Sequence, residues 1–140
     1  MTIDEKKQYL MQYSSSCGRL KKLNELKQRC IGQAENISPV YSDMPKSASN
    51  QSKIESAVCQ IIDIERQISE EKEKAVNLCI KIKNAIESLS NPRERDVLYM
   101  RYIVGGYRLM KYDEIAEGMN YSERQVYRIY EKGIEHIVID

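Results

Sequence analysis

The sequence predicts an all-α protein in which a long antiparallel, coiled-coil-like helical hairpin precedes a group of short helices. Three observations support this fold class. Apolar residues recur at steps of three and four over most of the first 90 residues. One stretch rich in proline and serine interrupts that period. Short segments with helix-capping residues fill the rest of the 140-residue chain. We expect two domains, residues 1–89 and residues 90–140.

Residues 3–34 are expected to form the first helix. Ser14, Ser15 and Ser16 followed by Gly18 weaken it. Serine side chains compete for backbone hydrogen bonds, and glycine costs about 1 kcal/mol inside a helix. The sequence therefore allows a break at this point. The residues that follow the helical period are Ile3, Leu10, Tyr13, Cys17, Leu20, Leu23, Leu26 and Cys30.

The helical period disappears between residues 35 and 52. Pro39 and Pro45 lie in this stretch, and neither can donate a backbone hydrogen bond. Five serines surround them. We expect a long loop here, which in its simplest role is a mobile connector.

The second long helix has the most regular pattern of the chain, with apolar steps that alternate between four and three. Glu71 is the one polar residue in this seam. At 1.5 Å per residue the pattern spans roughly 50 Å, and the first helix can fold back against much of it. The seam residues are Ala57, Ile61, Ile64, Ile68, Glu71, Ala75, Leu78, Ile82, Ala85 and Leu89.

Three further apolar residues lie on another side of this helix. Ile62, Val76 and Ile80 are about 100–140° round the helix from the seam. One partner helix cannot cover both sides. Either the C-terminal segment packs against these residues, or a second chain does. The second explanation predicts a homo-oligomer, in the simplest case a dimer, formed through the hairpin.

A short helix is predicted to begin after Asn91. Asn91 can cap it, Pro92 suits the first helical position, and Glu94 completes a capping-box pattern. The helix should continue through Ile103 and end at Gly105-Gly106.

Residues 112–129 have the pattern of two short helices that cross at a steep angle. Ala116 provides a small residue for the crossing, and Asn120 tolerates the left-handed backbone of a tight turn. Ser122 can cap the next helix, with Gln125 completing a second capping box. This pattern predicts a helix-turn-helix whose recognition helix runs from residue 123 to about residue 138. The inward-facing positions are Ile115, Met119, Tyr121, Val126 and Ile129.

The outward face of the recognition helix is expected to contact double-stranded DNA. Arg124 and Arg128 are four residues apart in its first two turns. A guanidinium group there can pair with the O6 and N7 atoms of guanine in the major groove. Lys132, one turn further, suits a phosphate. The predicted DNA-binding residues are Ser122, Glu123, Arg124, Gln125, Tyr127, Arg128 and Lys132.

Tyrosines allow two interpretations. The hydroxyl groups of Tyr121, Tyr127 and Tyr130 can contact phosphates. Alternatively, tyrosine is the core aromatic residue of a chain that contains no Phe and no Trp, and this applies in particular to Tyr99, Tyr102 and Tyr121.

Charge argues against tight binding by a single copy. The whole chain has 22 Lys and Arg against 21 Asp and Glu, and residues 91–140 have 8 basic and 9 acidic residues. Because non-specific affinity depends on the number of phosphates neutralised, one copy should bind DNA weakly. Dimerisation, or help from a partner, is therefore expected.

The composition excludes several other classes. No apolar run is long enough to span a membrane, and no apolar stretch follows the charged start as in a signal peptide. Four widely spaced cysteines and a single histidine, His136, predict neither a metal site nor a Cys–His or Ser–His catalytic arrangement. We expect a cytoplasmic protein with reduced thiols, no cofactor and no enzymatic activity.

The run from Asn91 to Tyr102, with Glu114-Ile115-Ala116 and Tyr121-Ser122, resembles region 4 of sigma-70-type RNA polymerase sigma factors. In those proteins this region recognises the promoter −35 element and touches the polymerase flap. The fuller chain is similar to phage and prophage transcription regulators of the ArpU/RinA kind. The resemblance implies a sequence-specific regulator with DNA contacts from Glu123, Arg124, Tyr127, Arg128 and Lys132.

This sequence departs from the sigma pattern in two ways. Sigma factors usually have Arg-Glu-Arg after the cap, whereas Glu123-Arg124-Gln125 follows Ser122 here, and Asn120 replaces the turn glycine. The first change argues against a standard −35 sequence as the target.

Three alternatives remain open. A sigma-like factor would act through contact with RNA polymerase, although the regions that melt promoter DNA have no counterpart in this length. A phage small terminase-like DNA-binding subunit would form rings. A coiled-coil adaptor would not bind DNA.

Overall fold

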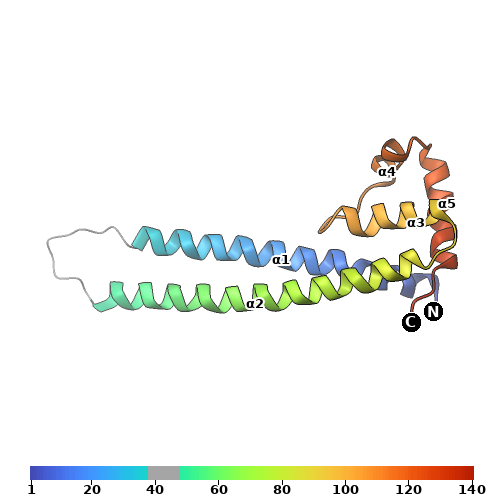
Figure 1. Cartoon of the computed structure of the whole chain (residues 1–140). Coiled ribbons are helices and arrows are strands. Elements are labelled where there is room, and N and C mark those ends of the chain that lie inside the picture. The colour runs from blue at the N-terminus through green and yellow to red at the C-terminus, as the bar shows by residue number, and fades with distance from the viewer. Residues whose placement is uncertain (38–47) are drawn as a thin grey trace. The chain divides into compact units, whose positions relative to one another are not determined.

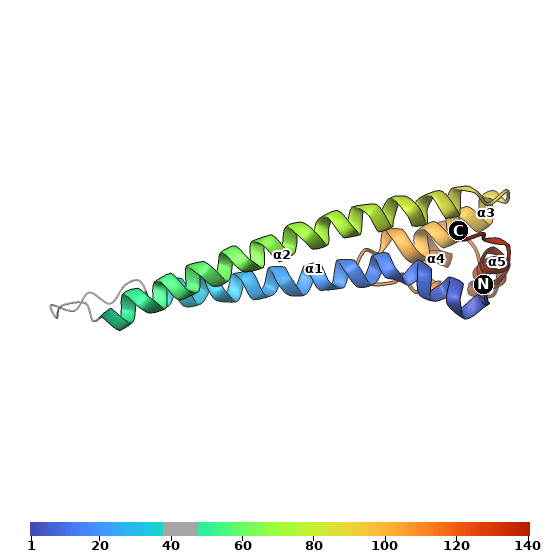
Figure 2. The same cartoon turned by 90° about the horizontal axis from the view of Figure 1, so that it is seen from below.

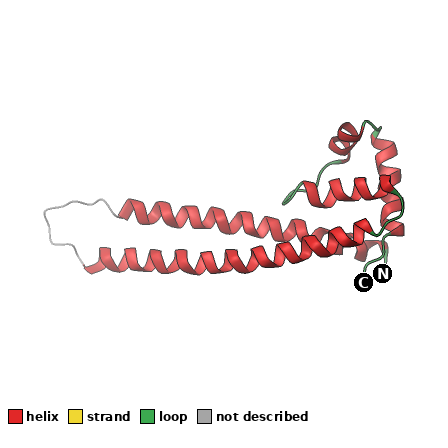
Figure 3. Ribbon diagram, viewed as in Figure 1, coloured by secondary structure: helices red, strands yellow, loops and turns green. Residues whose placement is uncertain are grey.

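The computed structural model describes residues 1–37 and 48–140 (Figure 1). Every regular element in this part of the chain is helical, which confirms the all-α class (Figure 3). No helix in these residues combines the length and apolar character needed to cross a membrane. The elements are α1 (Ile3–Ile37), α2 (Ala48–Glu87), α3 (Pro92–Tyr99), the π-helical turn η1 (Met100–Val104), α4 (Tyr112–Met119) and α5 (Glu123–His136).

Residue contacts divide the chain into two compact units. The first unit contains Met1–Gly18 and Glu73–Asp140, and the second contains Arg19–Lys72. Helices α1 and α2 therefore contribute residues to both units, and α3, α4 and α5 belong to the first. The domain boundary expected between residues 89 and 90 stays a prediction, since it concerns whether the two parts fold separately.

Helix α1 is continuous, so the break that the sequence allows between Ser14 and Gly18 does not occur. Ser14 and Ser16 are both buried. The Ser14 hydroxyl donates to the backbone carbonyl of Tyr107 over 3.1 Å. Because a residue outside the helix accepts this bond, the hydroxyl does not compete with the α1 backbone.

Both predicted boundaries of the loop at residues 35–52 are wrong. Residues 35–37 continue α1, and residues 48–52 already belong to α2. Adding a residue to an existing helix costs far less than starting one, so a helix extends beyond the last residue of its apolar pattern. The centre of the predicted loop, residues 38–47, lies outside the described residues.

The seam predicted on α2 is confirmed, because each of its positions is buried or partly buried. Its one polar member, Glu71, forms an ion pair with Arg19 of α1 over 2.9 Å. A second pair joins Lys27 to Glu65 over 3.3 Å. From the first ion pair to the second, the residue number rises on α1, from 19 to 27, and falls on α2, from 71 to 65. The two helices therefore pack antiparallel, as Figure 2 also shows.

The second apolar side of α2 stays uncovered. Ile62, Val76 and Ile80 are 58%, 57% and 53% exposed. Within the first unit, the C-terminal segment therefore does not cover Val76 and Ile80. Covering by a second chain remains a prediction.

The core of the first unit joins elements that are far apart in the sequence. Leu10 of α1 and Ile82 of α2 are fully buried, in the same apolar cluster as the side chains of α3, α4 and α5. The ends of the long helices thus complete the core beneath the C-terminal helices. The other fully buried members of this cluster include Ile86, Val97, Leu98, Ile115, Val126, Ile134 and Ile137.

Candidate nucleic-acid interface

Helix α3 begins as predicted. The Asn91 side chain accepts a hydrogen bond from the backbone N–H of Arg93 over 2.9 Å, and Pro92 occupies the first turn. The capping box predicted for Glu94 is wrong, because its carboxylate contacts His136 and accepts no hydrogen bond from the backbone N–H of Asn91. Glu94 is 3% exposed, and its two carboxylate oxygen atoms lie 3.0 Å and 3.2 Å from Nδ1 of His136. Glu94 therefore links the start of α3 to the end of α5.

The helix continues beyond α3 as the π-helical turn η1, which the sequence did not predict. This turn buries Tyr102 and Ile103. It ends at Gly105, followed by Gly106 with a φ of 63°, in agreement with the predicted stop. A Cβ atom at Gly105 would overlap the carbonyl oxygen of Arg108, so only glycine fits there.

The turn between α4 and α5 has the predicted geometry. Asn120 adopts the left-handed conformation with φ 57° and ψ 41°, and the N–H of Tyr121 donates to the carbonyl of Ala116 over 3.0 Å. Ser122 caps α5 by accepting a hydrogen bond from the N–H of Gln125 over 3.2 Å. The helix-turn-helix prediction is confirmed at this level.

Helix α5 ends at His136 and not at about residue 138 as expected. Ile137 leaves the helix with a ψ of 137° and is buried, so its burial in the core replaces another helical turn. Lys6 of α1 contacts the same end of α5. Its ammonium group donates to the carbonyls of Ile134 and Glu135 over 3.2 Å and 3.0 Å. A cation at this position stabilises the carbonyl end of a helix.

The inward face of α5 packs closely on α3. Val126 is fully buried, and Ile129 is partly buried, as predicted. A Cβ atom at Gly133 would lie 3.2 Å from a methyl group of Leu98, so the small residue allows close approach. The sequence pattern missed Ile134, which is buried on the same face.

The outward face of α5 carries the predicted DNA-binding residues. Arg124 and Arg128 form no ion pair with any residue of the described chain, so their guanidinium groups are available to a ligand. Arg124 and Arg128 outnumber Glu123 in the first half of the helix, whereas Glu131 and Glu135 outnumber Lys132 in the second half, so the net positive charge lies in the first half. All seven predicted residues are exposed: Ser122, Glu123, Arg124, Gln125, Tyr127, Arg128 and Lys132.

Tyr130 does not belong to this face, and its predicted phosphate contact is wrong. Its side chain is buried, and its hydroxyl lies 2.6 Å from the hydroxyl of Tyr102. Burial raises the pKa of Tyr130 and of Tyr102 above the ordinary value of 10.0. Tyr127 is 46% exposed, and its ring packs against the ring of Tyr112 with a centroid distance of 5.5 Å. Tyr127 is therefore held in place while remaining accessible.

Arg93 is a further cation near the start of α5. Its guanidinium carbon lies 5.8 Å from the centre of the Tyr121 ring, and Tyr121 directly precedes the Ser122 cap. Arg93 is itself exposed. Nothing in the local sequence pairs α3 with the α5 cap, so the pattern did not single out this residue.

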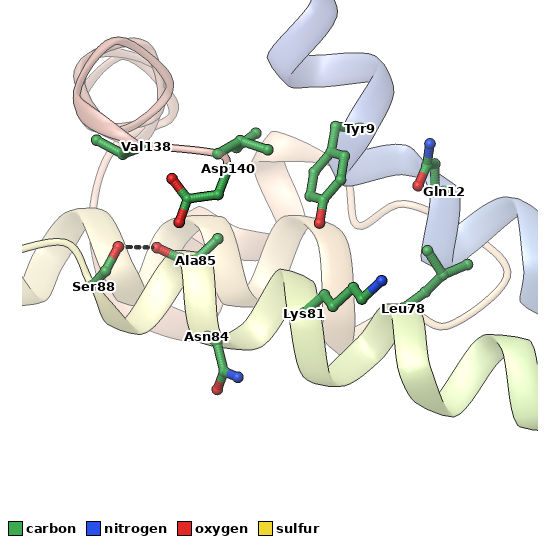
Figure 4. A pocket seen from close by; sticks show the side chains of 10 residues that line it. Tyr9, Gln12, Leu78, Lys81, Asn84, Ala85, Ser88, Val138 and Asp140 are labelled. Carbon is green, nitrogen blue, oxygen red and sulfur yellow. Dashed lines mark hydrogen bonds between the residues drawn. The ribbon is translucent and has the colours of Figure 1, made fainter.

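The first unit also has an open pocket of about 610 Å³ between α1, α2 and residues 138–140. Figure 4 shows Tyr9 of α1 and Lys81 of α2 on its walls, with Asp140 beside them. The Ser88 hydroxyl on the same wall donates to the carbonyl of Ala85. With one cation and one carboxylate in its lining, this pocket offers no concentration of positive charge. It is a poorer candidate for nucleic acid than the face of α5.

Comparison with known families agrees with this geometry. Residues 85–137 match the family described as Sigma-70, region 4. The matched segment begins at the end of α2 and extends through α5, so it contains the complete helix-turn-helix. Neither a curated protein nor a solved structure matches the chain.

Proposed function

We propose that the protein is a sequence-specific double-stranded DNA-binding transcription regulator of phage or prophage type, without enzymatic activity. The observation that carries the proposal is a Sigma-70 region 4 helix-turn-helix at residues 85–137 whose second helix presents Arg124 and Arg128, both exposed and without ion pairs in the described chain.

In this proposal, the first half of α5 enters the major groove. Arg124 and Arg128 face base edges, where each guanidinium–guanine pair contributes about 1–3 kcal/mol of discrimination. Lys132 and Arg93 contact phosphates on either side, and the Ser122 end of α5 directs the positive end of the helix dipole at the DNA backbone.

The phage-type assignment depends on the resemblance of the fuller chain to ArpU/RinA-type regulators. A helical N-terminal part before a sigma-like helix-turn-helix is consistent with it. Because Glu123-Arg124-Gln125 departs from the sigma pattern, we expect an operator of the protein's own and not a standard −35 element.

We also propose that the protein acts as a homodimer formed through the helical hairpin. Residues 91–140 have a net charge of −1, so a single copy gains little from counterion release. Two linked copies bind two half-sites with a higher effective affinity.

The decisive experiment is selection of bound fragments from the source genome at moderate salt, followed by affinity measurements on the selected site. Arg124→Ala and Arg128→Ala should each weaken binding to that site by about 1–3 kcal/mol. Lys74→Ala, which removes an exposed positive charge from α2, is the matched control and should have little effect. Full affinity in both arginine variants would contradict the assignment of α5.

A sigma-like factor that acts through RNA polymerase is the second candidate, because the matched family is a part of sigma factors. This candidate predicts co-purification of the full-length protein with core RNA polymerase, which an operator-binding regulator does not require. Absence of binding between the purified protein and core polymerase would exclude it.

A further inference from the structure

Exposed apolar residues gather on one side of α2 within the second unit. Ile54, Val58 and Ile62 are 36%, 45% and 58% exposed, and they follow each other at steps of four. With an advance of about 100° per residue they lie within about 80° of one another. Ile64 and Ile68, which pack in the hairpin core, lie about 120–160° round the helix from Ile62, and Ile54 lies between the two groups.

Two opposite charges lie beside this apolar group. Glu55 and Arg66 are 11 residues apart, about three turns, so their directions differ by only about 20°. Val58 and Ile62 lie between them along the helix. Arg66 has only a long contact of 3.9 Å with Asp63, and Glu55 forms no ion pair with any described residue. Both charged side chains are therefore available to a partner.

We propose that this face of α2, made of Ile54, Glu55, Val58, Ile62 and Arg66, is the contact surface between two copies of the chain. The two α2 helices run antiparallel about a two-fold axis that passes between Val58 and Ile62. This inference deepens the proposed dimerisation by naming the surface and its register.

The charge pattern selects this arrangement. The axis lies midway between Glu55 and Arg66, so Glu55 of each copy faces Arg66 of the second copy, and the apolar residues of both copies meet at the centre. In a two-fold symmetric contact of this kind, the same Glu55–Arg66 ion pair forms at both ends of the interface. A parallel arrangement in register would place Glu55 against Glu55 and Arg66 against Arg66, and like charges in contact disfavour it.

DNA is a poor occupant of the same face. Glu55, Asp63 and Glu65 are exposed on or beside it, and carboxylates repel phosphates.

The proposed contact between two copies has only three apolar side chains from each copy, whereas a stable interface buries roughly 800 Å² per partner. We therefore expect a dimer that dissociates on dilution and not a permanent one.

Charge reversal in the full-length protein tests the register. In sedimentation velocity without DNA, Glu55→Arg and Arg66→Glu should each weaken self-association by at least about tenfold, because each variant brings like charges together at both ends of the contact. An equimolar mixture of the two variants should associate again, since every pair in the mixed dimer then has opposite charges. The double variant Glu55→Arg/Arg66→Glu should associate for the same reason.

Glu25→Arg, which reverses an exposed charge on α1 of the same unit, is the matched control and should associate like the unchanged protein. Circular dichroism establishes that each variant keeps its helical content. A protein that is monomeric at all concentrations would overturn the inference. So would single variants that associate normally, or a mixture of folded variants that stays monomeric. Because no DNA is present, the result is independent of whether α5 binds an operator.

Discussion

At the scale of single residues, the hydroxyl pair of Tyr102 and Tyr130 stabilises the first unit in a way that depends on both members. The two oxygen atoms are 2.6 Å apart and buried. Removing either hydroxyl breaks this hydrogen bond, which costs about 1–3 kcal/mol, whereas removing the second hydroxyl as well cannot break the same bond again. Their coupling is therefore measurable.

Tyr130→Phe should lower the free energy of unfolding by about 1–2 kcal/mol. The double variant Tyr102→Phe/Tyr130→Phe should cost clearly less than the two single changes together. Urea denaturation of all four proteins measures this cycle. Strict additivity would show that the two hydroxyls do not interact in solution.

The same pair predicts a loss of stability in alkali. Burial raises both pKa values above 10.0 in the folded protein, while in the unfolded chain they return to about 10. Below pH 10 both states keep the protons, so the contribution of the pair is fully present. As the pH rises above about 10, the unfolded state loses its protons first, and the free energy of unfolding falls.

Urea denaturation between pH 9 and pH 11 measures this fall, and the double phenylalanine variant should show a smaller one. Some pH dependence should remain from Tyr13, whose pKa is raised to about 12, mainly by a hydrogen bond with Cys17. A double variant with an unchanged pH profile would contradict this origin.

At the scale of elements, the start of α1 behaves as a part of the helix-turn-helix. Leu10 belongs to the same buried apolar cluster as Val126 and Ile134 of α5, and the Lys6 ammonium group donates to the last carbonyls of that helix. Lys7 adds a cation 5.8 Å from the centre of the Tyr130 ring. The position of the recognition helix thus depends on residues more than one hundred positions earlier in the chain.

Leu10→Ala should lower the free energy of unfolding of the first unit by about 2–5 kcal/mol, because it leaves a cavity in a fully buried site. Leu26→Ala makes the same chemical change at a residue of α1 that is 40% exposed, and it should cost much less. Thermal denaturation followed with a probe on α5 compares the two variants. Equal effects would argue against a shared core.

The same elements explain what the sequence could predict. Asn91, Asn120 and Ser122 act on their immediate neighbours, and their roles in caps and turns follow from local chemistry. The pairs Lys6–Ile134, Glu94–His136 and Tyr102–Tyr130 join residues 28 to 128 positions apart, and no periodic pattern contains them. The π-helical turn η1 also has no short-range signature. The exposed face of α5 was therefore predictable, whereas its supports were not.

At the scale of the whole molecule, the proposed DNA binding combines base contacts with a small number of phosphate contacts. Arg93 belongs to the second group, since it lies beside the Ser122 end of α5 and not on its outward face. Phosphate contacts add affinity to every DNA sequence equally.

Arg93→Ala should weaken binding to the selected operator and to unrelated DNA by similar factors, and should reduce the slope of log affinity against log salt by about 1. Arg128→Ala should instead weaken binding to the operator more than to unrelated DNA. Fluorescence anisotropy over a series of salt concentrations measures both effects. A loss confined to the operator in Arg93→Ala would assign this residue to base recognition.

The discontinuous first unit has a consequence for synthesis of the chain. Its core needs both residues 1–18 and residues 73–140, and the segment between them folds into the second unit. A ribosome therefore releases Leu10 and Lys6 long before it makes the helix they support, and the hairpin of the second unit can form first. When that hairpin forms, it brings residues 1–18 and residues 73–140 closer together, so the loop-closure entropy that opposes formation of the core becomes smaller.

Shortening the hairpin by whole helical turns should thus preserve the native fold of the first unit. Cutting the chain between residues 18 and 73 should instead make folding of the first unit bimolecular and dependent on concentration.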